Sequence, residues 1–170
     1  MATICNSSKY FISLHSGLHI PVVTQASVKT LTKYNNTMYY IFISHSWKYS
    51  NAYESIVSFL DRELGANNWK DYSVPQNDPV HTNGTDKELY EAIEKKIKCC
   101  SCVIILAAMY STYSKWINKE VEIARKWHKP IIAVKPWGAE RVSTIVTDAA
   151  DKVVGWNGFS IAEAVKEVCR

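Results

Sequence analysis

The stretch Val103-Ile104-Ile105-Leu106-Ala107 decides the fold class of this chain. A continuous apolar run of this length is typical of a central strand in a parallel sheet, which is buried on both faces. Helical patterns lie on either side of it, at Asp86–Lys98 and at Lys115–His128. Thr85 and Glu88 have the spacing of a capping box at the start of the first of these helices. The run therefore predicts a buried strand between two crossover helices.

The alternation of strand and helix continues outward in both directions. Further strands are predicted at Tyr39–Ile43, Trp69–Val74, Ile131–Val134 and Lys152–Gly155. Further helices are predicted at Ala52–Leu64 with Gly65 as C-cap, at Arg141–Ala150, and at Ile161–Val168 begun by Ser160. Such a pattern predicts an α/β fold, a doubly wound parallel five-stranded sheet in three α/β/α layers. Right-handed, short connections favour the strand order 2-1-3-4-5.

Residues 1–37 differ in composition from residues 38–170, which hold the alternating pattern. The first segment contains three lysines and no acidic residue, and it has no sustained helical period. It could be a weakly ordered extension, an addition upstream of a start at Met38, or an arm with edge strands. We expect one domain over 38–170 and leave these three interpretations open.

Composition limits the classes of function. An apolar content of 47% and a charged content of 21% are ordinary for a globular protein. The formal net charge is +4, and only +1 of it falls in residues 38–170, so no nucleic-acid partner is expected. No apolar stretch reaches the roughly 18 residues of a membrane span, so no membrane partner is expected.

The five cysteines do not suggest a disulfide framework, because their number is odd and three of them cluster at 99–102. We interpret Cys99, Cys100 and Cys102 as small buried residues that enter a strand. No histidine or second cysteine pair lies at zinc spacing, so no metal site is expected. Cysteines without a disulfide framework favour a reducing, cytoplasmic location.

Polar residues follow the first and third predicted strands, where the order 2-1-3-4-5 places its switch point. Open α/β sheets bind ligands at this point, outside the carboxyl ends of the strands. The residues are Ser44, His45, Ser46 and Trp47 after the first strand and Ser111 and Ser114 after the third. Their hydroxyl and backbone N–H groups could bind phosphate or ribose, and the serines could equally cap helices.

Glu120 is the candidate catalytic residue. It follows Trp116 by four residues, so both lie on one face of the predicted helix. A carboxylate near a helix N-terminus is expected to stay ionised. It could stabilise the oxocarbenium-like state of N-glycosidic bond cleavage. Trp116 could supply a flat apolar wall, or it could pack in the core.

The ordered set of motifs resembles the TIR superfamily, and most closely the TIR-like branch that includes the TIR protein of the bacterial Thoeris antiphage system. The matching pieces are Tyr40–Ser46, Trp116-x-x-x-Glu120, Trp69–Pro79, Lys129–Gly138 and Val154–Asn157. The resemblance implies a flavodoxin-like fold and hydrolytic cleavage of the nicotinamide–ribose bond of NAD. Glu120 would be the essential glutamate, and Phe42 with residues Ser44 to Trp47 would line the nucleotide pocket.

The same resemblance implies NAD as substrate, no cofactor, and a linear or cyclic ADP-ribose product that activates a separate effector. It also implies activity that depends on self-association. Three other functions stay open: a non-catalytic interaction module, a sensor that binds a nucleotide without cleaving it, and a nucleoside deoxyribosyltransferase. Replacing Glu120 would not affect the first, and the last would act on deoxynucleosides instead of NAD.

Overall fold

The computed structural model describes residues 37–44, 50–75, 84–107, 114–135, 137–138 and 143–169. In these segments strands and helices alternate along the chain as the sequence pattern predicts. The strands are β1 (Tyr39–Ser44), β2 (Trp69–Asp71), β3 (Cys102–Leu106), β4 (Ile131–Lys135) and β5 (Lys152–Gly155). The helices are α2 (Ser50–Leu60), a π-helical turn (Asp61–Gly65), α3 (Asp86–Cys99), α4 (Ser114–Lys126), α5 (Thr144–Ala149) and α6 (Gly158–Val168).

The five strands form one parallel sheet in the order β2-β1-β3-β4-β5. This confirms the predicted order. Ile41 of β1 lies opposite Cys102 of β3, and Val103 of β3 lies opposite Ile131 of β4. The strand at 102–106 is therefore central, and its neighbours come from distant parts of the sequence.

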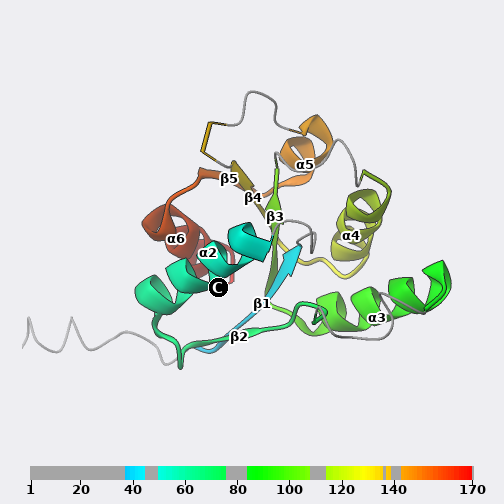
Figure 1. Ribbon diagram of the computed structural model, residues 1–170, viewed down its shortest axis with the longest axis horizontal. Coiled ribbons are helices and arrows are strands. Elements are labelled where there is room, and N and C mark those ends of the chain that lie inside the picture. The colour runs from blue at the N-terminus through cyan, green and yellow to red at the C-terminus, as the bar shows by residue number, and fades with distance from the viewer. Residues whose placement is uncertain are drawn as a thin grey trace, which may run out of the picture. The chain divides into compact units, whose positions relative to one another are not determined.

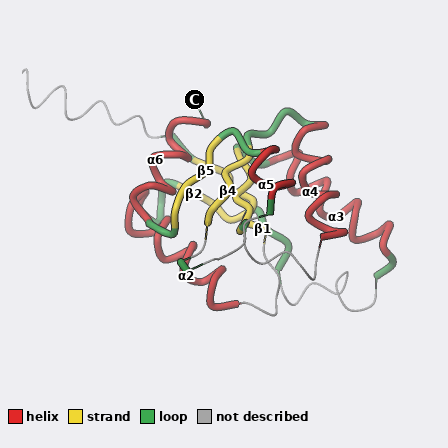
Figure 2. Tube along the Cα trace, turned by 90° about the horizontal axis from the view of Figure 1, so that it is seen from above, coloured by secondary structure: helices red, strands yellow, loops and turns green. Residues whose placement is uncertain are grey.

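Helices cover both faces of the sheet (Figures 1 and 2). Helices α2 and α6 pack together on one face, while α3, α4 and α5 lie on the other. The chain therefore crosses to opposite faces after β1 and after β3, as a doubly wound sheet requires. None of the helices within the described segments is long and apolar enough to cross a membrane.

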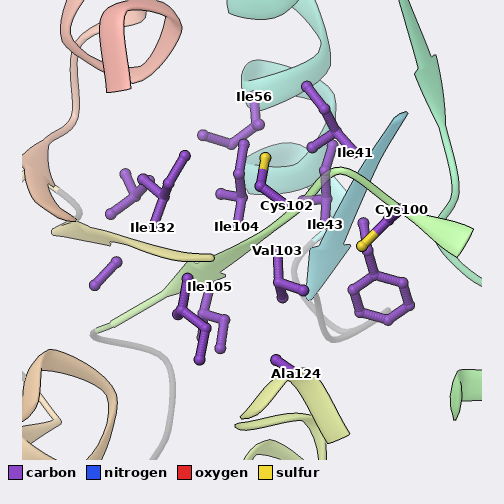
Figure 3. Packing of buried hydrophobic residues seen from close by; sticks show 14 of the residues in the cluster. Ile41, Ile43, Ile56, Cys100, Cys102, Val103, Ile104, Ile105, Ala124 and Ile132 are labelled. Atoms are coloured by element: carbon purple, nitrogen blue, oxygen red, sulfur yellow. The ribbon is translucent and has the colours of Figure 1, made fainter. Parts of the chain in front are cut away.

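The hydrophobic core lies on both sides of β3, whose five residues are all buried. Figure 3 shows Ile104 on the side of Ile56 from α2, whereas Val103 and Ile105 point toward Ala124 of α4. A strand buried on both faces has no solvated side to alternate with. This explains why its sequence is a continuous apolar run.

Strand β2 (Trp69–Asp71) is shorter than the predicted strand Trp69–Val74. The backbone N–H of Tyr72 still donates to the carbonyl of Ile41 in β1 at 2.8 Å, but beyond it polar side chains replace the backbone hydrogen bonds between the two strands. The Asp71 carboxylate accepts the backbone N–H of Ser73 at 2.7 Å, which turns the chain. The buried Ser73 hydroxyl then accepts the backbone N–H of Ile43 at 2.9 Å. A side-chain oxygen thus takes the place that a strand carbonyl would hold.

Helix ends also depart from the predicted ones in several places. The predicted helix Ala52–Leu64 changes from α to π geometry at Asp61 and ends at Gly65, whose φ of 88° suits a residue without a side chain. Helix α6 begins at Gly158 and is capped by Asn157, whose side chain accepts the N–H of Ser160 at 3.1 Å. The predicted helix start at Ser160 is therefore wrong, because the side-chain amide of Asn157 caps the helix. Helix α5 covers only residues 144–149 of the predicted helix 141–150. Residues 141 and 142 lie outside the described segments.

The predicted capping box of α3 is confirmed. The Thr85 hydroxyl accepts the N–H of Glu88 at 3.3 Å, and the Glu88 carboxylate accepts the N–H of Thr85 at 2.7 Å.

We expect Thr85→Ala to lower the free energy of unfolding by about 1 kcal/mol, because an N-terminal amide of the helix loses its acceptor. Urea unfolding measures the change. Thr144→Ala, at the exposed first position of α5, is the control and is expected to stay within about 0.5 kcal/mol of the parent. Equal losses in both variants would contradict the capping role.

Candidate active site

The carboxyl ends of β1 and β3 form the switch point of the sheet. Ser44 is the last residue of β1 and lies opposite Ile105 of β3. Because strand side chains alternate, Ser44 shares with Phe42 the face that α3 and α4 cover. The fold therefore places the Ser44 hydroxyl beneath the helix that follows β3.

Glu120 lies on the face of α4 that packs on the sheet. Its helical neighbours Ile117, Val121 and Ala124 are all buried, and Glu120 itself is only 7% exposed. Among the described residues it is the one buried acidic side chain. A carboxyl group at a position that packing would give to an aliphatic residue makes Glu120 a candidate functional residue.

A hydrogen bond joins the two elements of the site. The Ser44 hydroxyl, itself 3% exposed, donates to Oε2 of Glu120. The two residues are 76 positions apart in the sequence. This contact brings together two candidate site residues, and the sequence pattern does not predict their hydrogen bond.

Burial determines the protonation of Glu120. Loss of hydration raises the pKa of the carboxyl from 4.5 to about 7, and the hydrogen bond from Ser44 only partly offsets this rise. The expectation of a readily ionised carboxylate is therefore wrong. Glu120 is the seventh residue of α4, beyond the first turn in which the helix dipole acts strongly. A carboxyl with this pKa populates both protonation states near neutral pH, as an acid–base or charge-stabilising group requires.

Trp116 lies one turn before Glu120 and packs against the hydrophobic core. The ammonium group of Lys119 sits 4.4 Å from the centre of the Trp116 ring. The structure thus supports the packing role for this indole, with a cation–π contact on the ring. A wall for substrate remains a prediction.

The structure describes only some of the other predicted site residues. Phe42 is 2% exposed and belongs to the core beneath the site. Ser114 begins α4, but its side chain is not described. His45, Ser46, Trp47 and Ser111 lie outside the described residues. Within the described part of the chain, no cluster of three or more His, Cys, Asp or Glu side chains could hold a metal ion.

We expect Ser44→Ala to raise the pKa of Glu120 above its present value of about 7, because the hydrogen bond that favours the carboxylate is lost. Carbon NMR of the labelled Glu120 carboxyl during a pH titration measures the shift. Ser55→Ala, on an exposed hydroxyl of α2, serves as the control and should leave the titration unchanged. A lower pKa in Ser44→Ala would contradict this account of the hydrogen bond.

The fold and the site define a flavodoxin-like α/β protein with a buried carboxyl at the switch point of its sheet. The sequence model of the family described as "Thoeris protein ThsB, TIR-like domain" matches residues 42–141. The chain belongs to this family. The match contains both Ser44 and Glu120.

The solved structures that are similar to this chain include two with described activities or families. The CMP N-glycosidase BcmB of Clostridium botulinum has a TM-score of 0.47 and 13% identity, and the match covers 75% of this chain and 98% of that one. A 3-dehydroquinate dehydratase-like protein from Bifidobacterium longum has a TM-score of 0.45 and 10% identity, with coverages of 78% and 95%. No protein with a curated description shows significant similarity to this sequence.

Proposed function

We propose that this protein is an NAD-consuming enzyme that cleaves the bond between nicotinamide and ribose. The observation that carries the proposal is the buried Glu120 carboxyl, bound to Ser44 at the switch point, in a chain of the ThsB TIR-like family. The product would be linear or cyclic ADP-ribose, acting in the cytoplasm as an antiphage signal to a separate effector.

The proposed reaction uses Glu120 in its ionised form. As the glycosidic bond breaks, nicotinamide leaves with the bonding electron pair, and positive charge develops at the ribose. A carboxylate in a site of low dielectric stabilises that charge strongly. Hydrogen bonds from the ribose hydroxyls to the same carboxylate would orient the sugar. Attack at the ribose by water gives ADP-ribose and a proton, whereas attack by an adenine nitrogen closes a cyclic product.

The pKa of Glu120 gives the reaction a pH dependence. Because burial raises this pKa to about 7, the ionised fraction rises across the neutral range. We therefore propose that the rate increases with pH through an apparent pKa near 7. Ser44 favours the ionised form and holds the carboxyl in place, so it is a positioning residue.

The test is incubation of the full chain with NAD at high protein concentration, which allows any self-association that completes the site. Nicotinamide release is followed by chromatography, and mass spectrometry separates ADP-ribose from a cyclic ADP-ribose, which is lighter by one water. Turnover that depends on Glu120 supports the proposal. No release, even after addition of lysate from phage-infected cells, would overturn it, and so would turnover of deoxynucleosides but not of NAD. NAD binding without a product would identify a sensor.

A further inference from the structure

The end of strand β4 carries two exposed side chains at the carboxyl edge of the sheet, the edge at which Ser44 binds Glu120. Lys135 is the last residue of β4 and is exposed, although the four residues before it are buried. Trp137 follows two residues later and is 89% exposed, more than any other large hydrophobic side chain in the described segments. Tryptophan is well buried in most folded proteins, so packing within this chain does not explain Trp137.

The register of the sheet places Lys135 on the same face as Ser44. Ser44 of β1 lies opposite Ile105 of β3, which in turn lies opposite Ala133 of β4. Register partners point to the same face, and side chains alternate along a strand, so Lys135, two residues after Ala133, points to this face as well. It is the face on which α4 brings Glu120 to Ser44.

The offset between Ser44 and Lys135 suits the parts of a dinucleotide. Strand β4 lies two strands from β1, which is roughly 10 Å across the sheet. Lys135 also lies two residues, or roughly 7 Å, further toward the carboxyl edge than the register partner of Ser44. In NAD the nicotinamide ribose continues through a diphosphate to adenosine. A ribose held at Glu120 would therefore direct its diphosphate toward the Lys135 ammonium group.

The charge of Lys135 is available to a ligand. No ion pair between described residues engages Lys135, whereas Lys126 and Lys152 each pair with a glutamate. The helices that follow parallel strands begin at the same edge, and the positive ends of their dipoles favour anions. A lysine ammonium group binds phosphate as a point charge. A diphosphate is thus the ligand that this end of β4 favours.

The connection that carries Trp137 returns to the strand beside the site. Ser143, directly before α5, donates its backbone N–H to the carbonyl of Ala107 at 2.9 Å. Ala107 directly follows β3, which is the neighbour of β1. The connection therefore leaves the end of β4 and comes back to the end of β3. An exposed indole on it can stack on a nucleobase, because every base presents a flat face.

We propose that Lys135 and Trp137 form the subsite for the diphosphate and the adenine of a dinucleotide substrate. Lys135 binds the diphosphate by charge, and Trp137 stacks on the adenine ring. This inference rests on the proposed function, because it assigns the half of NAD that does not react. The subsite makes the enzyme selective for dinucleotides over nucleosides. It therefore also separates NAD cleavage from deoxyribose transfer between nucleosides, which carry no phosphate.

The test compares three substrates that share the bond between nicotinamide and ribose. They are NAD, nicotinamide mononucleotide, which has a phosphate but no adenine, and nicotinamide riboside, which has neither. Lys135→Met should lower kcat/KM at least about tenfold for NAD and the mononucleotide, as expected for a lost hydrogen bond to a charged group. The riboside should be unaffected. Trp137→Ala should lower kcat/KM at least about fivefold for NAD alone, and Trp137→Phe should keep most of the parent value.

Lys70→Met is the matched control for the change in charge. Lys70 is an exposed lysine in β2 and lies opposite Tyr40, away from the carboxyl edge. It should keep the parent values for all three substrates. The subsite is overturned, with NAD cleavage left in place, if Lys135→Met and Trp137→Ala cleave NAD as the parent does. It is also overturned if they lose equally on all three substrates.

Calorimetry with ADP-ribose tests the subsite separately from turnover. This probe has the diphosphate and the adenine but no nicotinamide. If the parent cleaves no NAD, the proposed function fails, and weaker binding of ADP-ribose by Lys135→Met and Trp137→Ala would still support the subsite. Absence of ADP-ribose binding to the parent, or equal binding to the parent and both variants, would overturn it.

Discussion

In the Glu120→Gln variant we expect the rate of NAD cleavage to fall at least about a hundredfold, the lower end of the effect of a positioned acid–base group. The amide has nearly the size of the carboxyl and can still accept the Ser44 hydroxyl. It carries no negative charge, so it cannot stabilise the positive charge of the departing sugar. The loss should therefore appear in kcat more than in KM. Initial rates of nicotinamide release over a range of NAD concentrations measure both.

Glu122→Gln is the matched control for this experiment. Glu122 lies two residues further along α4, and its side chain is exposed. The substitution makes the same change in charge on the same helix, but away from the buried face. We expect at least half of the parent activity in this variant. Equal activity of the Glu120 and Glu122 variants would remove Glu120 from the reaction.

At pH 8 the Glu120→Gln variant should be more stable than the parent protein by about 3 kcal/mol. This figure converts the rise of the pKa from 4.5 to about 7 at about 1.4 kcal/mol for each pKa unit. Below pH 4.5 the carboxyl is protonated in both the folded and the unfolded chain, so its ionisation does not lower the free energy of unfolding. As the pH rises toward 7, the unfolded chain loses its proton while the folded chain keeps it, and folding becomes less favourable. Above 7 the full cost of a buried charge is present.

Urea unfolding of both proteins at pH 5 and at pH 8 measures this dependence. The difference in unfolding free energy between variant and parent should be small at pH 5 and large at pH 8. Glu122→Gln should show no such dependence, because its side chain stays in water. If Glu120→Gln were instead the less stable protein at pH 8, the buried carboxylate would be stabilised by its surroundings, contrary to the desolvation that dominates its pKa.

The two expectations for Glu120 have the same origin. A carboxyl among Ile117, Val121 and Ala124 weakens the folded state, and packing alone would place an aliphatic side chain there. A residue that opposes stability is understandable where it supplies function. Loss of activity with a gain in stability would therefore distinguish a catalytic Glu120 from a structural one.

The sequence by itself determined the elements and their order. The apolar run at 103–107 predicted a strand buried on both faces, and the amphipathic stretches around it predicted the crossover helices. The capping box at Thr85 and the end of a helix at Gly65 were also readable, because each depends on residues within one turn of the chain. Short connections and right-handed crossovers then fixed the sheet order, and with it the end of β1 and the start of α4 as the place for a site.

The tertiary structure decided what depends on contacts between distant residues. The early end of β2 follows from the Ser73 hydroxyl that binds the N–H of Ile43, 30 positions away. The hydrogen bond between Ser44 and Glu120 and the raised pKa of that carboxyl depend on how closely α4 packs on the sheet. Local patterns encode helix and strand because both repeat over a few residues, whereas burial and protonation depend on neighbours that only the folded chain brings together.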